Sequence, residues 1–314
     1  MSLSLVMNNL SKYYGNNKAL DNIDLEVSSG KIFGFLGPNG AGKSTMIKIL
    51  TTLIPPTSGK LSILGIDAIK FPLQVRKKIG VILQQPSYEP ILTVEKSLDK
   101  YGMMWGIPKT ERKKRVEMLL NDFDLIDIRK KRNTDLSIGQ RRRVQVAREF
   151  MHDLEILFLD EPTIGLDIGS RRQLLDHLKN KAKKGLTIFY TTHILSEVEY
   201  ICDKVAIINN GKILTVDTPS GIKTKFGNTK TIRIHISTRQ DKVADILSKI
   251  QDCGIWLNTG TDIIIHSEES EMLLQKVLKI LNEFDIEVDN LSVDPSSLED
   301  VFLKIVGDSN VSSN

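Results

Sequence analysis

The chain has 314 residues, 40% hydrophobic and 26% charged, which predicts about two domains and excludes disordered and fibrous proteins. Its 43 basic and 39 acidic residues leave a net charge of +4, too small to indicate nucleic acid as a partner. The two cysteines, Cys202 and Cys253, are far apart, which excludes a disulfide framework or a cysteine zinc site and fits a reducing compartment.

Residues 3–216 alternate short apolar runs with longer helical patterns. Five continuously apolar runs are typical of strands buried on both faces of a sheet: Ile32–Leu36, Ile79–Leu83, Ile156–Leu159, Leu186–Tyr190 and Val205–Ile208. Four helical patterns lie among them: Lys43–Leu53, Ser137–Met151, Ser170–Lys183 and Ile194–Cys202. This alternation predicts the α/β class, with a mainly parallel sheet core. Two further helical patterns, Thr93–Gly106 and Lys109–Phe123, have no strand between them and predict a helical subdomain at about residues 86–150.

A second pattern follows the turn-rich residues 217–229. It predicts strands at Lys230–Ile236, Gly254–Leu257, Asp262–His266 and Ile286–Val293, and helices at Asp241–Ile250, Glu269–Leu281 and Ser296–Val306, the last capped by Ser296 or Ser297. The order β-α-β-β-α-β is that of a small α+β ferredoxin-like domain. We therefore expect domains at 1–226 and 227–306, followed by a polar tail at 307–314. Because no apolar run approaches about 20 residues and the N-terminus lacks a signal pattern, we expect neither a membrane span nor a signal peptide.

The segment Gly37–Thr45 carries the strongest motif, G-x4-G-K-[ST], directly after the predicted strand Ile32–Leu36. Glycines at 37, 40 and 42 let backbone N–H groups turn inward and hold phosphate oxygens, and the following helix adds its positive end. Lys43 can reach the β and γ phosphates, and the Ser44 hydroxyl can bind Mg²⁺. The alternative is an ordinary glycine-rich turn, which the strand–loop–helix context disfavours.

Two carboxylates follow another predicted strand. Asp160 ends the apolar run Ile156–Leu159, where it can lie beside the same Mg²⁺, and Glu161 comes next. A carboxylate next to the metal can orient or deprotonate an attacking water. The alternative is an acidic corner between strand and loop. Together the cradle, the metal site and the water-positioning group predict phosphoryl transfer from a triphosphate to water.

The segment Leu136–Gln140, with sequence Leu-Ser-Ile-Gly-Gln, distinguishes among phosphate-loop proteins. With Gln84, the Asp160–Glu161 pair, Gly165-Leu-Asp167 and His193, it resembles the nucleotide-binding domain of ABC (ATP-binding cassette) transporters. The resemblance covers roughly residues 3–226, with the motifs in the family's order. It implies a phosphate-loop ABC cassette with a mainly parallel sheet core, antiparallel N-terminal strands and a helical subdomain.

The resemblance also implies the site residues. The catalytic residues would be Glu161, His193, Gln84 and Lys43. The ATP-binding residues would be Tyr14, Gly37, Pro38, Asn39, Gly40, Ala41, Gly42, Lys43, Ser44, Thr45, Ser137, Gly139, Gln140 and Asp167. The Mg²⁺ ligands would be Ser44, Gln84 and Asp160. Tyr14 falls where the family stacks adenine on an aromatic ring, although it could instead be one of a strand-end aromatic pair.

The signature segment, which we define as Leu136–Gln140, departs from the family's usual Leu-Ser-Gly-Gly-Gln at Ile138. Ser137 and Gln140 have the spacing of a capping box, which predicts a helix start at this point. In the family, the serine hydroxyl and the second glycine's N–H touch the γ-phosphate held by the opposite subunit. Ser137 and Gly139 keep those groups, whereas Ile138 could crowd the approach and slow hydrolysis.

The resemblance implies two chains, identical or paralogous, that pair head-to-tail around two ATP molecules and drive a separate transmembrane permease. We expect the subunit at the cytoplasmic face of the membrane, with no nucleic-acid partner. Pro295–Leu303 resembles the closing segment of daunorubicin-type exporter ATPases, which implies an exporter with a C-terminal regulatory or assembly domain. The alternatives are an ABC ATPase that acts on nucleic acid or the ribosome, and a weakly hydrolysing, nucleotide-gated interaction protein.

Basic runs surround the helical subdomain at Lys109–Arg115, Arg129–Arg132 and Arg141–Arg143. We interpret them as solvated helix faces rather than as a surface for anionic lipid. Met103, Met104 and Trp105 are interpreted as helix packing, although the family uses this subdomain to form the groove that receives the permease.

Overall fold

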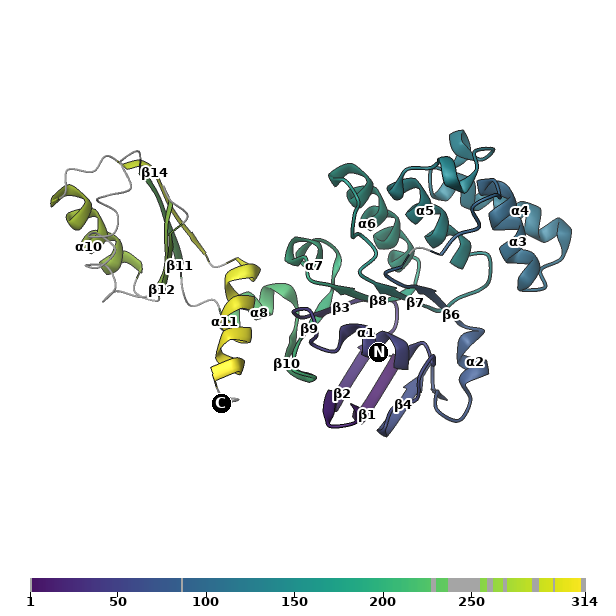
Figure 1. Cartoon of the computed structure of the whole chain (residues 1–314), viewed down its shortest axis with the longest axis horizontal. Coiled ribbons are helices and arrows are strands. Elements are labelled where there is room, and N and C mark those ends of the chain that lie inside the picture. The colour runs from purple at the N-terminus through teal and green to yellow at the C-terminus, as the bar shows by residue number, and fades with distance from the viewer. Residues whose placement is uncertain are drawn as a thin grey trace. The chain divides into compact units, whose positions relative to one another are not determined.

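The computed structural model describes residues 2–85, 87–226, 230–236, 255–258, 262–267, 270–283, 288–295 and 297–311. The chain divides into two compact units, residues 1–218 and 219–314 (Figure 1). The division falls before α8 (Pro219–Phe226), because α8 packs against α11 (Leu298–Val311) of the C-terminal part. The turn-rich sequence predicts a boundary after residue 226, so the structure differs by assigning α8 to the second unit.

A six-stranded sheet forms the centre of the first unit, in the order β10-β9-β3-β8-β7-β6. Its strands are β3 (Ile32–Leu36), β6 (Ile79–Ile82), β7 (Ile156–Asp160), β8 (Thr187–Thr192), β9 (Lys204–Asn209) and β10 (Lys212–Asp217). All neighbours are parallel except β9 and β10. Every residue of β3, β7 and β8 is buried, as continuous apolar runs predict for a sheet covered on both faces. The predicted α/β class is confirmed.

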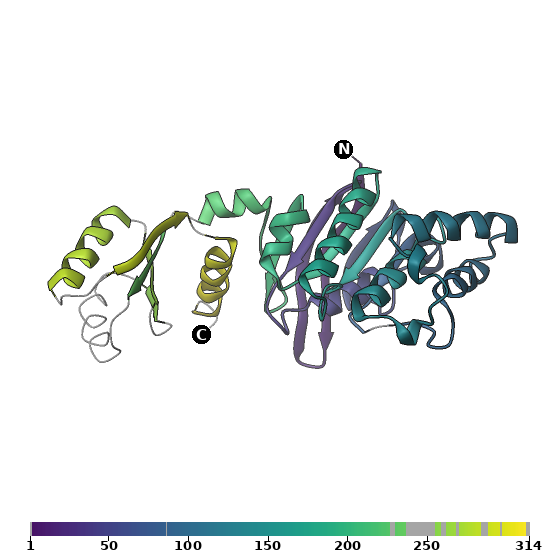
Figure 2. The same cartoon turned by 90° about the horizontal axis from the view of Figure 1, so that it is seen from above.

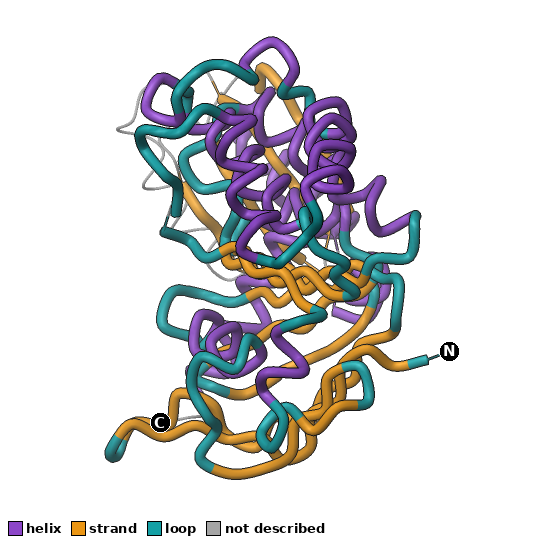
Figure 3. Tube along the Cα trace, turned by 90° about the vertical axis from the view of Figure 1, so that its right-hand side faces the viewer, coloured by secondary structure: helices purple, strands orange, loops and turns teal. Residues whose placement is uncertain are grey.

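Helices cover both faces of this sheet, as the strands and helices of Figure 3 show. The helices that connect its strands are α1 (Lys43–Leu50), α2 (Pro72–Arg76), α6 (Ile168–Lys183) and α7 (Leu195–Ile201). The helix predicted to reach Leu53 ends at Leu50, because Thr52 adopts the left-handed conformation with φ of +59°.

The N-terminal strands form a separate antiparallel sheet in the order β2-β1-β4-β5. They are β1 (Leu3–Tyr14), β2 (Asn17–Ser28), β4 (Ser58–Ile63) and β5 (Ile66–Asp67). One buried apolar cluster joins this sheet, α1 and the central sheet, with Phe33 stacked on Phe189 at 5.7 Å between ring centroids. This cluster fixes the phosphate loop between the two sheets, since the loop joins β3 to α1.

The predicted helical insertion contains α3 (Val94–Met104), α4 (Lys109–Asp122) and α5 (Ile138–Glu149), with 3₁₀ turns at Ile126–Ile128 and Asn133–Asp135. Figures 1 and 2 show α3 and α4 together, on a side of the central sheet away from β1 and β2. Their buried side chains belong to the same apolar cluster as those of α5 and α6. The start of α5 is therefore held by packing against the body of the cassette.

The second unit contains an antiparallel sheet in the order β12-β13-β11-β14. Its described elements are β11 (Lys230–Ile236), β12 (Ile255–Asn258), β13 (Asp262–Ser267), α10 (Ser270–Glu283), β14 (Val288–Pro295) and α11 (Leu298–Val311). This order is consistent with the predicted ferredoxin-like arrangement; the predicted helix at 241–250 lies outside the described residues. The hydroxyl of Ser297 accepts the Asp300 N–H at the start of α11. This helix continues to Val311, beyond the predicted start of the tail at 307, since no proline interrupts it.

Candidate active site

The phosphate loop, Gly37–Thr45, joins β3 to α1 as predicted. Gly42 caps α1 with φ of +110°, and a Cβ added there would lie 2.6 Å from the Ala19 carbonyl oxygen. A Cβ added at Gly37 would lie 2.4 Å from the Ile208 carbonyl oxygen. Both positions therefore need glycine, Gly42 for its backbone conformation and both for lack of space.

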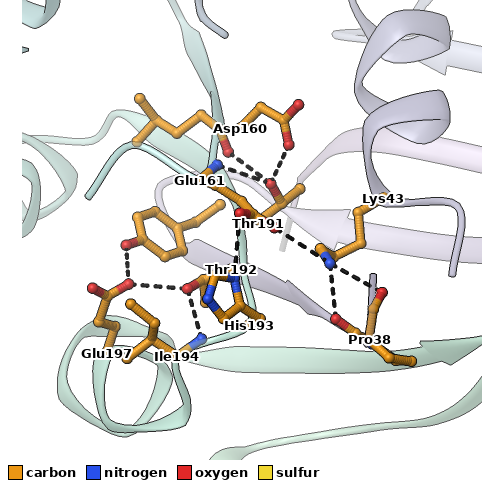
Figure 4. A network of polar contacts seen from close by, with 12 residues as sticks. Pro38, Lys43, Asp160, Glu161, Thr191, Thr192, His193, Ile194 and Glu197 are labelled. Atoms are coloured by element: carbon orange, nitrogen blue, oxygen red, sulfur yellow. Dashed lines mark hydrogen bonds and ion pairs between the residues drawn. The ribbon is translucent and has the colours of Figure 1, made fainter. Parts of the chain in front are cut away.

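Lys43 is almost fully buried, with 5% of its side chain exposed. Its Nζ donates to the carbonyl oxygens of Gly37 at 2.8 Å and Pro38 at 3.1 Å, and it lies 3.3 Å from Glu161 Oε1. Figure 4 shows these contacts between the loop and the end of β7. A buried ammonium needs such partners, and here they hold the lysine inside the loop and beside Glu161.

Asp160 and Glu161 stand at the end of β7, next to the end of β8. The Thr191 hydroxyl donates to Asp160 Oδ1 at 2.6 Å, and the Glu161 N–H donates to the Thr191 carbonyl oxygen at 3.1 Å. Glu161 has φ of +47°, a left-handed conformation that costs free energy in a residue with a side chain and is common at functional sites. Its second oxygen, Oε2, lies 3.2 Å from His193 Nδ1, so one carboxylate links the lysine to the histidine.

A buried glutamate that sequence reasoning missed supports the turn that carries His193. Glu197 Oε2 accepts the Tyr190 hydroxyl at 2.5 Å and the Thr192 hydroxyl at 3.0 Å, and Thr192 Oγ1 in turn accepts the Ile194 N–H at 2.9 Å. Burial, reinforced by the Glu197 carboxylate, raises the pKa of Tyr190 well above its usual value. The contacts fix the chain on both sides of His193. In the sequence, Glu197 is one of several polar residues that follow His193 in a helical pattern. Nothing in that pattern indicates that its side chain is buried.

A cavity of about 590 Å³ opens over the phosphate loop, a volume that suits a small-molecule ligand. Its lining unites predicted residues from separate motifs: Tyr14, Asn39, Gly40, Gly42, Lys43, Ser44, Thr45, Gln84 and Glu161. It also includes residues that the sequence did not suggest: Asn17, Lys18, Ala19, Asn210 and Gly211. Asn17, Lys18 and Ala19 begin β2, and Asn210 and Gly211 form the β9–β10 turn, so only the folded sheets bring them to the loop.

Other predicted residues do not line this cavity: Gly37, Pro38, Ala41, Ser137, Gly139, Gln140, Asp160, Asp167 and His193. Pro38 and Gly37 hold Lys43 instead, and Ala41 is buried with 2% exposed. Asp160 is buried, with 5% exposed, and its carboxylate accepts the Thr191 hydroxyl. The signature segment and Asp167 form a second group of residues at the starts of α5 and α6.

The signature segment begins α5 with the predicted capping box. The Gln140 N–H donates to Ser137 Oγ at 3.2 Å, and the Ser137 N–H donates to Gln140 Oε1 at 3.0 Å. Ile138 is 53% exposed and approaches Gly165. None of Leu136–Gln140 lines the phosphate-loop cavity, so this helix start lies outside it.

Two helix starts lie side by side at the signature segment. Asp167 caps α6 by accepting the Ser170 N–H at 2.9 Å, and this bond lowers the pKa of Asp167. A Cβ added at Gly139 would lie only 2.4 Å from Ser170 Oγ. Gly139 is therefore required for the close approach of α5 and α6, in addition to any part in binding.

The interpretation of the basic runs as solvated faces is wrong for Arg142. Its side chain is 5% exposed and donates to the carbonyl oxygens of Leu83 and Gln84, each at 3.0 Å. The sequence did not indicate this burial, because Arg142 stands between two other arginines and its partners are carbonyl oxygens of a loop far away in the sequence. Arg129, from another of the basic runs, makes ion pairs with Glu95 and Glu117.

The predicted metal ligands supply oxygen atoms only: the Ser44 hydroxyl, the Gln84 amide oxygen and the Asp160 carboxylate. Oxygen donors of this kind suit Mg²⁺ rather than zinc or copper. Across the described residues, no group of three or more His, Cys, Asp or Glu side chains could hold a metal by itself. The same residues include no helix that is long and apolar enough to cross a bilayer.

A phosphate loop after a parallel strand, with an Asp-Glu pair at the end of a nearby strand, defines a phosphate-loop nucleoside triphosphatase. A family model described as ABC transporter matches residues 20–164. The daunorubicin resistance ATP-binding protein DrrA3 of Streptomyces coeruleorubidus is 30% identical over 307 residues, covering 97% of this chain and 96% of that protein.

Two solved structures share the fold. The structure of an ATP-binding subunit of an ABC transporter is 30% identical with a TM-score of 0.65, over 72% of this chain and 94% of that chain. A dimeric post-hydrolysis state of an ATP-binding cassette with ADP and Pi is 26% identical with a TM-score of 0.62, over 68% of this chain and 98% of that chain. The chain belongs to the ABC transporter family. It is an ATP-binding subunit that hydrolyses ATP, and subunits of this kind dimerise and work with a transmembrane permease.

Proposed function

We propose that two copies of this chain, or this chain and a paralogue, close head-to-tail around two ATP molecules and drive a separate permease. The observation that carries the proposal is the arrangement at Glu161, which lies between Lys43 of the phosphate loop and His193. The cavity beside it contains no residue of the signature segment, so one chain offers two different half-sites. If two chains pair about a two-fold axis, the phosphate-loop half-site of each chain meets the signature half-site of the other. Both half-sites of both chains are then used.

In this proposal the phosphate loop and Tyr14 bind ATP. Tyr14 is 50% exposed at the cavity, where its ring can stack on adenine. The loop from Gly37 through Pro38, Asn39, Gly40, Ala41 and Gly42 to Thr45 surrounds the phosphates with backbone N–H groups and the start of α1. Lys43 exchanges its carbonyl and carboxylate partners for β- and γ-phosphate oxygens.

Ser44, Gln84 and Asp160 would hold Mg²⁺. The bound ion would neutralise charge on the β- and γ-phosphates. Thr191 supports this role by fixing one oxygen of Asp160 with a 2.6 Å hydrogen bond, which leaves its carboxylate in a defined orientation. Removal of divalent cations with a chelator should abolish hydrolysis.

Glu161 would act as the general base. It takes a proton from water as the water oxygen bonds to the γ-phosphorus, and the bond from that phosphorus to the bridging oxygen of ADP breaks. His193 and Lys43, both within 3.3 Å of the Glu161 carboxylate, lie where negative charge develops. Gln84 would orient the water and sense the γ-phosphate.

The second half-site would come from the partner's copy of Ser137, Gly139, Gln140 and Asp167. The capping box keeps the start of α5 rigid, and the positive end of a helix favours a phosphate oxygen. The dimeric cassette with ADP and Pi supports this pairing.

A groove of about 750 Å³ lined by β6, α3 and α5 is the proposed permease site. Met104 is 71% and Trp105 is 38% exposed at this groove. Leu83 also lines the groove, and the next residue, Gln84, lines the ATP cavity. Exposed apolar side chains in a groove are typical of protein-binding surfaces. This contact would hold the subunit at the cytoplasmic face of the membrane.

The name of the relative in Streptomyces coeruleorubidus supports an exporter of a drug-like compound. The unit from residue 219 onward would regulate assembly.

A steady-state ATPase measurement tests the proposal. Glu161→Gln should lower the rate by about 10²–10⁴-fold with ATP binding retained, because the amide cannot take the proton. Glu155→Gln, an exposed residue just before β7 that pairs with Lys78, is the matched control and should keep the rate. Full activity of the Glu161 variant would contradict the assignment. Isolation of the complex from cells should recover a permease; recovery of ribosomes or nucleic acid would favour the alternative.

A further inference from the structure

A hollow of about 620 Å³ lies between α3 and α4, the helices that Figures 1 and 2 show together in the helical subdomain. Among the described residues, none that lines this hollow also lines the ATP cavity or the proposed permease groove. Its volume suits a small-molecule ligand. The charged side chains of its lining are Glu95, Lys96, Asp99, Lys109, Arg112, Lys113, Glu117 and Lys130.

The carboxylates of the hollow are already paired with arginines. Arg112 Nε donates to Asp99 Oδ1 at 2.5 Å. Arg129, which lies beside the hollow, donates to Glu95 at 2.9 Å and to Glu117 at 2.6 Å. Three carboxylates against these two arginines and four lysines leave an excess of three positive charges. The hollow is therefore a basic site in which the acidic groups are occupied.

The four lysines lack such partners. In the part of the chain that the structure describes, no carboxylate lies at ion-pair distance from the ammonium groups of Lys96, Lys109, Lys113 or Lys130. All four side chains are exposed. A lysine ammonium sits on a flexible stem with three donors, so several of them can converge on one anion.

The lysines of α4 stand where they oppose the stability of their own helix. Lys109 is the first residue of α4, and the positive end of a helix disfavours a cation. Lys113 follows one turn later, a spacing at which like charges repel. Glu111, the acidic residue of this first turn, is paired with Arg115. An anion bound between α3 and α4 would offset both unfavourable terms.

The fold adds a cation from a third segment. The chain that leads to α5 runs beside the start of α3, where the Val94 N–H donates to the Lys131 carbonyl oxygen at 3.1 Å. Lys130 thereby lines the same hollow as Lys96 of α3 and Lys113 of α4. The positive charges thus gather from separate parts of the sequence around one space, unlike a single charged helix face.

We propose that this hollow binds a phosphate-bearing anion. Phosphate oxygens accept charge-assisted hydrogen bonds from lysine, and the hollow is large enough for the group that carries the phosphate. The anion is either the headgroup of an acidic phospholipid or a free phosphate-bearing molecule. For the runs that contain Lys109, Lys113 and Lys130, this site replaces the interpretation as solvated faces alone. The proposal goes beyond the ATPase function and does not depend on the head-to-tail pair.

Two pairs of substitutions in the full chain test the site. The lining pair combines Lys96→Gln with Lys113→Gln. The control pair combines Lys100→Gln with Lys114→Gln, which are exposed lysines of the same two helices outside the lining. Both pairs remove the same charge from the same helices. Because the ATP cavity includes none of these residues, ATP binding and the thermal midpoint should stay near the wild-type values in both.

Vesicle flotation and calorimetry distinguish the two sources of the anion. Flotation compares phosphatidylcholine vesicles with and without phosphatidylglycerol. Calorimetry titrates pyrophosphate into the chain with ADP at saturation, so that the ATP cavity is filled. Whichever probe the wild type binds identifies the source. The lining pair should bind that probe about 30-fold more weakly, since each lysine near an anionic surface contributes about a factor of five.

The control pair should bind within about threefold of the wild type, because its lysines do not face the hollow. Equal losses in the two pairs would show attraction to general surface charge and would overturn the site. Absence of binding to both probes by the wild type would overturn it as well. Neither result bears on ATP-dependent dimer formation, which the Glu161→Gln variant tests separately.

Discussion

At the scale of single residues, the ends of β7 and β8 hold the chemistry in place. Glu161 keeps a left-handed backbone, and its N–H is bound by Thr191. The Thr191 hydroxyl, fully buried, orients Asp160. Thr191 therefore holds the Asp160 carboxylate through its hydroxyl and the Glu161 backbone through its carbonyl oxygen.

Thr191→Val should preserve shape but remove the 2.6 Å hydrogen bond to Asp160. We expect a loss of about 1–3 kcal/mol in the free energy of unfolding, because a buried acceptor loses its donor. The Mg²⁺ concentration needed for half-maximal ATPase should rise. Urea unfolding and a Mg²⁺ titration measure the two effects.

Thr187→Val is the matched control, since Thr187 is a buried threonine of the same strand whose hydroxyl binds Ser4 and Gly30. It should lose comparable stability and keep its Mg²⁺ dependence. A Thr191 variant with unchanged Mg²⁺ dependence would show that this hydroxyl does not orient the metal ligand.

Among the elements, α5 contacts several parts of the cassette. It begins at the signature segment, binds the backbone of the chain that follows β6 (residues 83–85 and 87–89), and packs within the helical subdomain. Glu149 at its end accepts the Val81 N–H at 3.1 Å and the Tyr101 hydroxyl at 2.8 Å. One carboxyl group thereby joins α5, β6 and α3. Burial raises its pKa above the usual 4.5, despite the opposing effects of these hydrogen bonds and of Arg148.

This shift predicts a pH dependence. Because the pKa of Glu149 is higher in the folded state, its ionisation lowers the free energy of unfolding as pH rises above about 4.5. Glu149→Gln cannot ionise and keeps an oxygen for the Val81 N–H. The stability difference, variant minus wild type, should therefore increase between about pH 4 and pH 8 in urea unfolding. A difference that stays constant across this range would contradict the shift.

The junction of α5 and α6 gives a second prediction at this scale. Gly139→Ala should lower the free energy of unfolding by about 1–3 kcal/mol, because its Cβ would meet Ser170 Oγ at 2.4 Å. Adding Ser170→Gly should recover part of the loss. A double-mutant cycle in urea measures this coupling, and additive effects would show that the side chain finds space elsewhere.

The same elements show what the sequence can and cannot predict. The parallel strands, the phosphate loop and the capping box of Ser137 and Gln140 depend on local patterns, and all are present. Burial of Arg142 depends on a loop nearly sixty residues earlier in the chain, whose free carbonyl groups no pattern reveals. Asn210 and Gly211 reach the cavity because they follow β9, which pairs with β3 in the folded sheet.

At the scale of the whole molecule, the chain has separate apolar cores in its two units. Every described residue that lines the ATP cavity belongs to the first unit. Truncation after Thr218 should therefore leave ATP binding unchanged while weakening dimer or permease assembly. Equilibrium ATP binding and sizing of the truncated chain measure the two effects. Loss of ATP binding in a folded truncation would instead place the second unit in the nucleotide site.

In the proposed head-to-tail pair, a second copy completes each ATP site through its signature segment. Light scattering after gel filtration tests it on Glu161→Gln, with and without Ser137→Ala, in the presence of ATP and Mg²⁺. We expect a dimer with one ATP per chain for the single variant, and ATP-bound monomers when Ser137 is also changed. An ATP-loaded Glu161→Gln chain that remains monomeric would contradict it, as would a double variant that dimerises equally well.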